Sequence, residues 1–485
     1  MALPNSPLKQ RLSPSKISNL RRRIMASLPT TNKGWLELGN QYLLRHPMRT
    51  APLVPERGEG LYMWDVEGRR FIDFQSGQLC VTLGHSHPDY VKALCDQAHK
   101  IIQVGTTFIA PSEVLLAKKM AEIAPDPLQK SFFACTGSES NEMALRLVRK
   151  YTDRFEVIAL MRGYHGQSYG SASITGRGGM LREGYGPMPT GASFIPTPYE
   201  YRCQFCRDEA CCNLGCADAA ENVIDSSTSG RPAAFFFEPL MSAAGQIVPS
   251  KEWIQRIVEI CRERDILTVA DEALTCFGRT GKWFAFEHFD FVPDIVTCSK
   301  GLGGAVPLCA VMTSTEIADA AVAKGFMPFS SHAGDPLLCE TGLANLEIVD
   351  RENLVENARV VGNYFMDRLK VMEETYEIVG EARGLGLCLG LELVTDKQSR
   401  EPNFDGAAIV TEYCYENGLW LPIVPRMLNK DPLSLRFMEL SGSQVLRFMP
   451  PITITEAQID ESLEIIEAGV RIAEERTARV APAVV

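Results

Sequence analysis

The sequence predicts an α/β protein with a mostly parallel sheet covered by helices, followed by a smaller α+β domain. Three short apolar runs support the sheet: AAFFFEP at residues 233–239, ILTVADE at 266–272 and DIVTCSK at 294–300. Parallel strands that are covered on both faces form such continuous apolar runs. Between the first two runs, Trp253 and Ile257 recur at helical spacing. Strands that alternate with helices indicate a parallel sheet.

The chain divides into regions of different composition, and its 485 residues are enough for two domains. Long amphipathic helices are predicted in LCETGLANLEIVD and ENARVVGNYFMDRLKVMEETY, and glycine-punctuated strands in GEARGLGLCLGLELV. We therefore predict a disordered basic tail (1–36), an N-terminal segment (37–80), a large domain (81–335) with a cysteine-rich insert (201–216), and a small C-terminal domain (336–485).

Charge and hydropathy exclude two classes of partner. The formal net charge is -11, whereas a nucleic-acid-binding protein needs a basic face to neutralise phosphates. No apolar run is long enough to span a bilayer, so no membrane association is expected. Small molecules are the expected partners.

The cysteines and the basic N-terminus bear on the compartment. Many of the 15 cysteines lie inside apolar runs, where a thiol packs as a small hydrophobe, and this favours a reducing compartment. The first residues lack the apolar region of a secretory signal peptide. We expect a cytoplasmic protein, with a mitochondrial location as the alternative because no acid precedes Glu37 in this basic segment.

The first candidate site follows the strand-like FFAC. Thr136, Gly137 and Ser138 come next, and then a helix with Met143 and Leu147 on one side. Small hydroxyl residues and a glycine at a helix N-terminus suit a phosphate, because free backbone N–H groups and the helix dipole point at it. An ordinary N-cap is the alternative.

Two further strand ends carry charged groups. Asp271 ends the run ILTVA, and a carboxylate there is costly unless a cation or donor accompanies it. Lys300 ends the next run, where partial desolvation lowers the pKa of an amine and makes it nucleophilic. A salt-bridged aspartate and a surface lysine are the alternatives.

Together the three strand ends predict a cofactor. Ligands of an open parallel sheet bind beyond the carboxyl ends of its strands. A phosphate cradle, a carboxylate for a ring nitrogen and an amine that forms an imine are what pyridoxal 5'-phosphate requires. The glycines of GLGGAVP, after Lys300, leave room beside that cofactor. This stretch lacks G-x-G-x-x-G, which disfavours a dinucleotide-binding oxidoreductase.

The stretch VADEALTCFGRTGKWFAFEHFDFVPDIVTCSKGLGGAVPL resembles the cofactor-binding signature of class III aminotransferases, a fold-type I family that uses pyridoxal phosphate. Within that family, DFQSGQLCVTLGHSHPDYV, SSHAGDPL and RFMPPITITEAQID are most similar to 2,2-dialkylglycine decarboxylases. The resemblance implies a large cofactor-binding domain, amino acid and keto acid substrates, and a homodimer or dimer of dimers.

The resemblance also implies roles for single residues. Lys300 would form the Schiff base and move protons, and Asp271 would pair with the pyridine nitrogen. Tyr164 would stack on the ring, and Arg447 would bind the substrate carboxylate. The phosphate would be held by Thr136, Gly137 and Ser138, joined by Ser331 from a second subunit.

Gln78, in the matching SGQ, bears on the choice of reaction. A donor at this position could hold a carboxylate perpendicular to the cofactor ring and direct loss of CO2, so we predict decarboxylation of a dialkylglycine-like amino acid coupled to amino transfer to a keto acid such as pyruvate. The alternative is an ordinary aminotransferase. Two departures favour that alternative. Leu274 stands where the family commonly has a glutamine or valine, and Ala243 replaces a serine expected near the carboxylate subsite of the decarboxylase.

An alkali cation is predicted at one place, and the cysteine-rich insert leaves a second possibility open. The resemblance aligns Thr107 and Asp335 with ligands of an alkali cation. The insert YRCQFCRDEACCNLGCADAAE could bind zinc or hold free thiols, but its second cysteine pair lacks C-x-x-C spacing and no histidine lies nearby. Its cysteines are Cys203, Cys206, Cys211, Cys212 and Cys216.

Overall fold

The computed structural model describes residues 28–44, 51–177, 182–205, 214–424, 438–440 and 442–480. The chain forms two compact units. The first comprises residues 1–57 and 63–70, and the second comprises residues 58–62 and 71–485. The predicted boundary between residues 335 and 336 lies within the second unit, where helix α11 begins.

The first unit contains helix α2 (Asn32–Tyr42). Thr31 caps this helix, because its hydroxyl accepts the N–H of Gly34. The Asn32 side chain donates to Asp65 at 2.8 Å and accepts the N–H of Val54 at 2.6 Å. We predicted disorder through residue 36, and this is wrong from Asn32 onward because the cap and these buried hydrogen bonds fix the start of the helix. The rest of the predicted tail, up to residue 27, lies outside the described residues.

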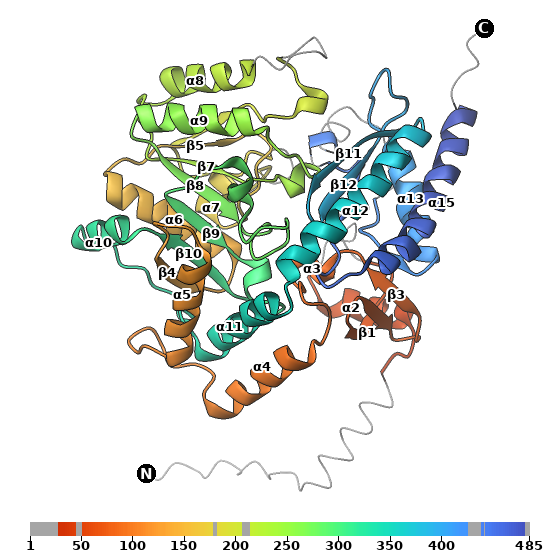
Figure 1. Cartoon of the computed structure of the whole chain (residues 1–485), viewed down its shortest axis with the longest axis horizontal. Coiled ribbons are helices and arrows are strands. Elements are labelled where there is room, and N and C mark those ends of the chain that lie inside the picture. Colours follow the sequence, from red (N-terminus) through yellow and green to blue (C-terminus); the bar gives the residue numbers. More distant parts are fainter. Residues whose placement is uncertain are drawn as a thin grey trace, which may run out of the picture. The chain divides into compact units, whose positions relative to one another are not determined.

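A seven-stranded sheet forms the centre of the second unit, in the order β4-β10-β9-β8-β7-β5-β6 (Figure 1). Neighbouring strands from β9 to β6 are parallel, and only β10 runs antiparallel to its neighbours. The bounds are β4 (Lys130–Ala134), β5 (Val157–Leu160), β6 (Ala192–Ile195), β7 (Ala234–Phe237), β8 (Leu267–Glu272), β9 (Ile295–Cys298) and β10 (Cys309–Thr313). The predicted mostly parallel sheet is confirmed, and each of the three apolar runs contains one of its strands.

Alternate residues of these strands enter two different cores. Phe235 and Phe237 face one core, whereas Phe236 faces the other. This follows from the two-residue period of a strand, and both faces are apolar because helices cover both. Helices α5 (Pro111–Ile123), α8 (Gly215–Ser227) and α9 (Lys251–Glu263) contribute to the first core, and α6 (Gly137–Thr152) and α10 (Thr315–Ala323) to the second.

The C-terminal part of the second unit has its own core around the sheet β11-β12-β14. Helices α12 and α13 contact the sheet, and α15 packs against α13 and α12 (Figure 1). The predicted change to an α+β pattern is therefore present. The elements are α11 (Pro336–Arg351), α12 (Leu354–Thr375), β11 (Val379–Leu385), β12 (Cys388–Leu393), α13 (Phe404–Glu416), β14 (Val445–Phe448) and α15 (Glu456–Val480).

Shorter elements connect these parts. Strand β3 (Arg70–Asp73) pairs in parallel with β13 (Leu419–Trp420) through Ile72 and Asp73. Strands β1 (Pro55–Glu59) and β2 (Tyr62–Asp65) and helix α4 (Pro88–Lys100) complete the N-terminal half. The remaining short helices are α3 (Ser76–Leu79), α7 (Tyr169–Ser173), η3 (Glu200–Arg202), η4 (Ser242–Ala244), η5 (Ala285–Phe289) and η6 (Lys300–Leu302).

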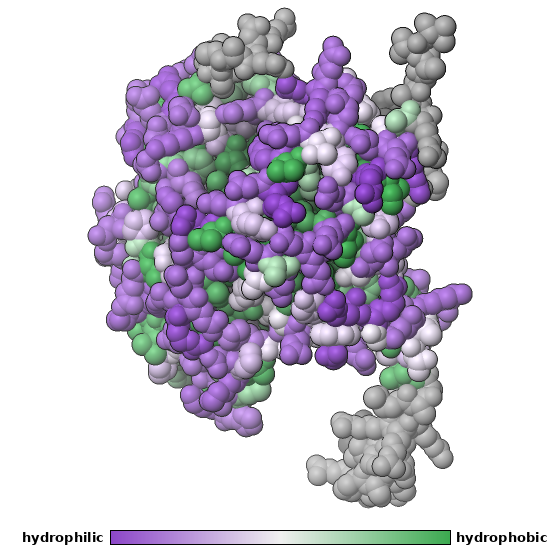
Figure 2. Space-filling model, turned by 45° about the vertical axis from the view of Figure 1, so that its right-hand side comes forward, coloured by the Kyte–Doolittle hydropathy of each residue, from purple (hydrophilic) through white to green (hydrophobic). Residues whose placement is uncertain are grey.

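In the face that Figure 2 presents, hydrophilic residues predominate and apolar residues occur in small groups. Among the described helices, none has both the length and the apolar character that crossing a bilayer requires.

Candidate active site

Asp271 lies near the carboxyl end of β8 and is only 4% exposed. Its Oδ2 accepts hydrogen bonds from Asn141 Nδ2 at 2.7 Å and from His165 Nδ1 at 2.8 Å, and its Oδ1 accepts the N–H of Ala273 at 3.0 Å. We call Asp271, Asn141 and His165 the Asp271 cluster. A carboxylate oxygen has two acceptor positions, so Oδ1 keeps a position for one further donor.

Electrostatics keep this buried carboxyl ionised. Burial by itself would raise the pKa of Asp271, but the hydrogen bonds and the charge of His165 hold it below its usual range. Conversely, burial would lower the pKa of His165, and the hydrogen bond to Asp271 raises it. The cluster therefore offers a fixed negative charge at a strand end, which suits a protonated ring nitrogen.

The N-terminus of α6 lies next to the strand ends that carry Asp271 and Lys300. A Cβ placed on Gly137 would lie 3.5 Å from the Cβ atoms of both Ala273 and Ser299. Thr136 caps the helix and forms a capping box with Glu139. The capping alternative for Thr136 is therefore realised, while the first N–H groups of the helix still have no partner within it.

Lys300 begins η6, separated by one residue from the end of β9, and is half-buried. Its charge acts on Glu238, Cys80 and Cys388, which places the amine among these groups. Helix α3, which carries Gln78, is in contact with η6. The Gln78 side chain is exposed, and the backbone bends at Gly77, whose φ of 63° is in the left-handed region that favours glycine.

Tyr164 lies on the loop after β5, and a buried carboxyl holds that loop. Its N–H donates to Glu238 Oε1 at 2.8 Å. Burial raises the pKa of Glu238 to about 7. The next residue, His165, belongs to the Asp271 cluster, so this loop connects the predicted stacking residue to the predicted ring-nitrogen partner.

Arg447 lies in β14, opposite Gly390 of β12. The guanidinium is half-buried, and its Nη1 donates to the carbonyl of Ser242 at 3.4 Å. Its charge reaches Cys388, as does that of Lys300. Arg447, Lys300 and η4, which contains Ala243, are therefore brought to one region.

Three further predicted residues lie on the segments that precede α5 and α11. Ser331 and Thr107 have exposed side chains. Asp335 is buried at the start of α11, where Oδ2 contacts His332 Nδ1 at 2.6 Å and Oδ1 has no hydrogen-bond partner. The segments that carry them are adjacent, because Gln103 donates to the carbonyl of Ser331 at 3.2 Å.

The cysteine-rich insert is only partly described. Cys203 is half-buried after η3, and Cys216 is buried in α8. Cys206, Cys211 and Cys212 lie outside the described residues. Within the described part of the chain, no group of three or more His, Cys, Asp or Glu residues is arranged to hold a metal ion.

Sequence reasoning missed Asn141, which links α6 to two strands. Its Nδ2 donates to Asp271 and to the carbonyl of His165, and its Oδ1 accepts the hydroxyl of Thr297 at 3.0 Å. The signal was available: Asn141 is a polar residue on the same face of α6 as Ala144, Leu145 and Val148, all of which are buried. A buried amide on an apolar helix face needs partners.

The arrangement of the residues in this site fits pyridoxal phosphate. The ionised Asp271 keeps one acceptor position, a helix N-terminus lies beside it, and Lys300 follows the neighbouring strand. The arrangement therefore suits this cofactor at the carboxyl ends of parallel strands.

Comparison with known proteins agrees with this assignment. Residues 44–470 match the family Aminotransferase class-III. The chain is 35% identical to a leucine/methionine racemase of Thermococcus litoralis, over 88% of this chain and 92% of the relative. It is 33% identical to a probable 4-aminobutyrate aminotransferase of Bacillus subtilis, over 91% and 98% of the two chains.

Solved structures agree as well. The omega transaminase of Pseudomonas jessenii in complex with PMP has a TM-score of 0.82 at 26% identity, and the match covers 92% of this chain and 99% of that one. The chain belongs to the class III aminotransferase family. Pyridoxal phosphate is the cofactor expected for that family, and the predicted fold type is confirmed. The finer resemblance to dialkylglycine decarboxylases stays a prediction, because the relatives named above are a racemase and aminotransferases.

Proposed function

We propose that this protein is a pyridoxal-phosphate-dependent aminotransferase that moves an amino group from an amino acid or amine to a 2-oxo acid. The observation that carries the proposal is the Asp271 cluster. Its buried, ionised carboxyl keeps a free acceptor position and lies on β8, the neighbour of the strand that Lys300 follows. The relatives named as aminotransferases support this ordinary reaction over decarboxylation.

The chain's own residues divide the work as follows. Bound pyridoxal phosphate supplies an electron sink for the bonds at the substrate α-carbon. Asp271 holds positive charge at the ring nitrogen, with His165 and Asn141 fixing its orientation. Lys300 would hold the cofactor and move the proton at the substrate carbon, and Arg447 would bind a substrate carboxylate through its planar fork. Tyr164 would cover the ring, and the N-terminus of α6, from Thr136 to Ser138, would hold the phosphate.

The test is amino transfer by the purified holoenzyme. We expect alanine to form from pyruvate with one or more of a panel of amino acids and amines, and Lys300→Ala to lower the rate by about 10³-fold or more, because it removes both nucleophile and proton carrier. Lys324→Ala is the matched control, since Lys324 contacts Asp153 on the surface. Normal transfer by Lys300→Ala, or a wild type without transfer, contradicts the proposal.

A second candidate function is decarboxylation coupled to amino transfer. It is favoured by Gln78, whose helix α3 is in contact with η6 and therefore near Lys300. If 2-aminoisobutyrate and pyruvate yield CO2, acetone and alanine, and Gln78→Ala lowers CO2 release more than transfer from proton-bearing donors, this candidate replaces the first. Loss of optical purity of leucine without a keto acid would instead indicate racemisation, the activity named for the Thermococcus relative.

We further propose a homodimer or dimer of dimers in which Ser331 reaches the phosphate site of a second subunit. Large apolar side chains are exposed on two adjacent segments, and they include Ile102, Phe108, Ile109, Met327 and Phe329. The same surface borders the start of α6, where Ser330 donates to Glu139 at 3.4 Å. Exposed apolar groups of this kind mark protein interfaces.

The oligomer test uses this surface. Light scattering should give a dimer or larger species for the wild type and a smaller species for Phe329→Glu with reduced amino transfer. A wild-type monomer would contradict the homodimer.

Two minor proposals complete the description. An alkali cation near Thr107 and Asp335 is supported by the unpartnered buried Oδ1 of Asp335, and a rate that is the same in K⁺ and in tetramethylammonium buffers would reject it. A cytoplasmic location is supported by the buried thiols, and fractionation of tagged protein tests it against a mitochondrial one.

A further inference from the structure

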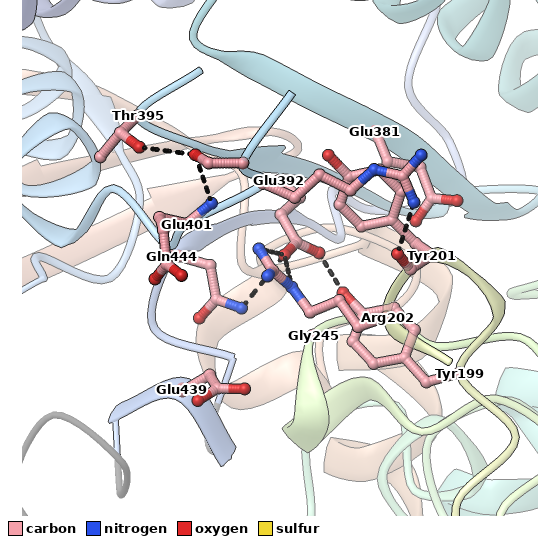
Figure 3. Close-up of polar contacts among 12 residues, drawn as sticks. Tyr199, Tyr201, Arg202, Gly245, Glu381, Glu392, Thr395, Glu401, Glu439 and Gln444 are labelled. Carbon is pink, nitrogen blue, oxygen red and sulfur yellow. Dashed lines mark hydrogen bonds and ion pairs between the residues drawn. The ribbon is translucent and has the colours of Figure 1, made fainter. Parts of the chain in front are cut away.

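A second buried charged group lies between η3 and the C-terminal sheet (Figure 3). We call Glu392, Arg383, Arg202, Tyr199 and Gln444 the Glu392 cluster. Glu392 projects from β12, Arg383 from the neighbouring β11, and Tyr199 and Arg202 from the chain around η3. None of these residues belongs to the site described above.

Glu392 is 0% exposed, accepts hydrogen bonds from Tyr199, Arg202 and Gln444, and forms an ion pair with Arg383. Arg202 Nε lies 2.6 Å from Oε1, and Arg383 Nη1 lies 2.6 Å from Oε2. Gln444 donates to Oε1 at 3.3 Å, and the Tyr199 hydroxyl donates to Oε2. The carboxylate is therefore saturated. Together with Glu381, whose Oε2 accepts from the same Arg383 Nη1 at 2.5 Å, it fixes the direction in which the Arg383 fork points.

The other edge of the Arg383 fork holds one backbone carbonyl. Nε donates to Gly245 O at 2.9 Å and Nη2 to the same oxygen at 2.7 Å. Gly245 has a φ of 104°, and a Cβ there would lie 2.9 Å from Val445 Cγ2 and 3.4 Å from Arg383 Nη2. The position thus requires glycine so that the carbonyl can approach the guanidinium.

Gly245 ends the turn that carries the carbonyl facing Arg447. The N–H of Gly245 donates to Ser242 O at 3.0 Å, and Arg447 Nη1 donates to the same oxygen at 3.4 Å. Ala243 lies within this turn, in η4. Any shift of Gly245 therefore moves an acceptor of the substrate-binding arginine.

Stability alone is a weak reason for such a buried network. Desolvation of buried ion pairs often cancels their attraction, whereas an arginine fork fixes geometry in a way that a lysine cannot. In this cluster the geometry that is fixed is the position of the turn Ser242–Gly245.

We propose that Arg383, oriented by Glu392, is a positioning residue for Arg447 and thereby determines the preference for donors that carry a carboxylate over simple amines. The proposal rests on the proposed function, because it assigns Arg447 to the substrate carboxylate. It adds residues that contact no substrate and act through the turn Ser242–Gly245.

The test compares two donors that differ by one group. L-Alanine and 2-aminopropane have the same skeleton, except that 2-aminopropane carries a methyl group where alanine carries its carboxylate. In single-turnover half-reactions of the holoenzyme, Arg383→Lys should reduce the efficiency with L-alanine about 10- to 100-fold, the scale produced by displacing a binding group by about 1 Å. The rate with 2-aminopropane should stay within roughly twofold of wild type, because that donor does not use Arg447.

A binding measurement gives a readout that does not depend on turnover. The affinity for propanoate, which has the carboxylate of alanine without its amino group, should fall in parallel in Arg383→Lys. Arg264→Lys is the matched control, since Arg264 contacts Glu221 on α8, away from the site. If Arg383→Lys folds poorly, Tyr199→Phe removes only one donor to Glu392 and should shift the same ratio in the same direction by a smaller factor.

Each outcome decides the proposal. Equal losses with both donors, or unchanged propanoate affinity, overturn it, because a merely structural role affects both donors alike. A wild type that binds propanoate but transfers no amino group disproves the proposed function alone, and weaker propanoate binding by Arg383→Lys still supports the positioning role.

Discussion

The Asp271 and Glu392 clusters both hold a buried carboxyl, but they differ in what surrounds it. Asp271 receives an imidazole, an amide and one backbone N–H, and keeps an acceptor position. Glu392 receives two guanidinium groups, a hydroxyl and an amide. In both, burial is opposed by donors and cations, so the pKa is held below its usual range. A lowered pKa therefore does not by itself distinguish the two carboxyls, whereas the remaining acceptor position of Asp271 leaves it able to bind a ligand.

The largest expected effect comes from Asp271→Asn. The amide keeps the shape but loses the charge that complements a protonated ring nitrogen. We expect the amino-transfer rate to fall about 10²- to 10³-fold, the scale for loss of one preorganised electrostatic partner. Asp265→Asn, at a surface pair with Arg231, is the control and should keep its rate. Normal activity of Asp271→Asn would contradict the proposed role of the Asp271 cluster in the reaction.

Glu392→Gln should lower stability and leave the rate with 2-aminopropane nearly unchanged, whereas Asp271→Asn lowers the rate. It leaves Arg383 and Arg202 buried around a neutral amide, and breaking a buried ion pair typically costs about 3–5 kcal/mol of unfolding free energy. Denaturant unfolding measures this cost, and the rate with 2-aminopropane should change little. Unfolding at the wild-type denaturant concentration would show that the cluster contributes no stability.

Glu238 sharpens the comparison, because it has a buried carboxyl with few donors. Its pKa is raised to about 7 from an ordinary 4.5, so the folded protein binds the proton more tightly than the unfolded chain does. Between pH 4.5 and 7 the folded state holds more protons, and stability therefore falls as pH rises through this window and levels off above it.

Glu238→Gln should remove this dependence, since an amide mimics the protonated acid. We expect the variant to lose less unfolding free energy than wild type between pH 5 and 8, by up to about 3 kcal/mol. Parallel pH profiles of wild type and variant would show that Glu238 is ionised throughout, as Asp271 is.

The smallest expected effect concerns Thr136. If Thr136 acts mainly as a cap, Thr136→Ala lowers the unfolding free energy by about 1 kcal/mol and leaves the affinity for pyridoxal phosphate within roughly twofold. A much larger fall in cofactor affinity would assign the Thr136 side chain to the phosphate. Thr31→Ala, at the cap of α2, is a matched control for the loss of a cap alone.

Much of this arrangement could be predicted from the sequence. Apolar runs predicted β7, β8 and β9, helical spacing predicted α6 and α9, and the strand ends predicted Asp271 and Lys300 as a pair. These features are local, because strand period, helix period and the order of strand and loop depend on neighbouring residues. The prediction of disorder through residue 36 was wrong because the Asn32 side chain finds partners at Val54 and Asp65, which lie far along the chain.

The sequence by itself therefore determined the fold class, the strand ends that carry the chemistry and the residue types needed by the cofactor. Only the tertiary structure decided which donors surround each carboxyl. Asn141 and His165 lie 130 and 106 residues from Asp271, and Arg202 lies 190 residues from Glu392. The charge of a buried group depends on such partners, and their positions follow from packing between elements that no local pattern records.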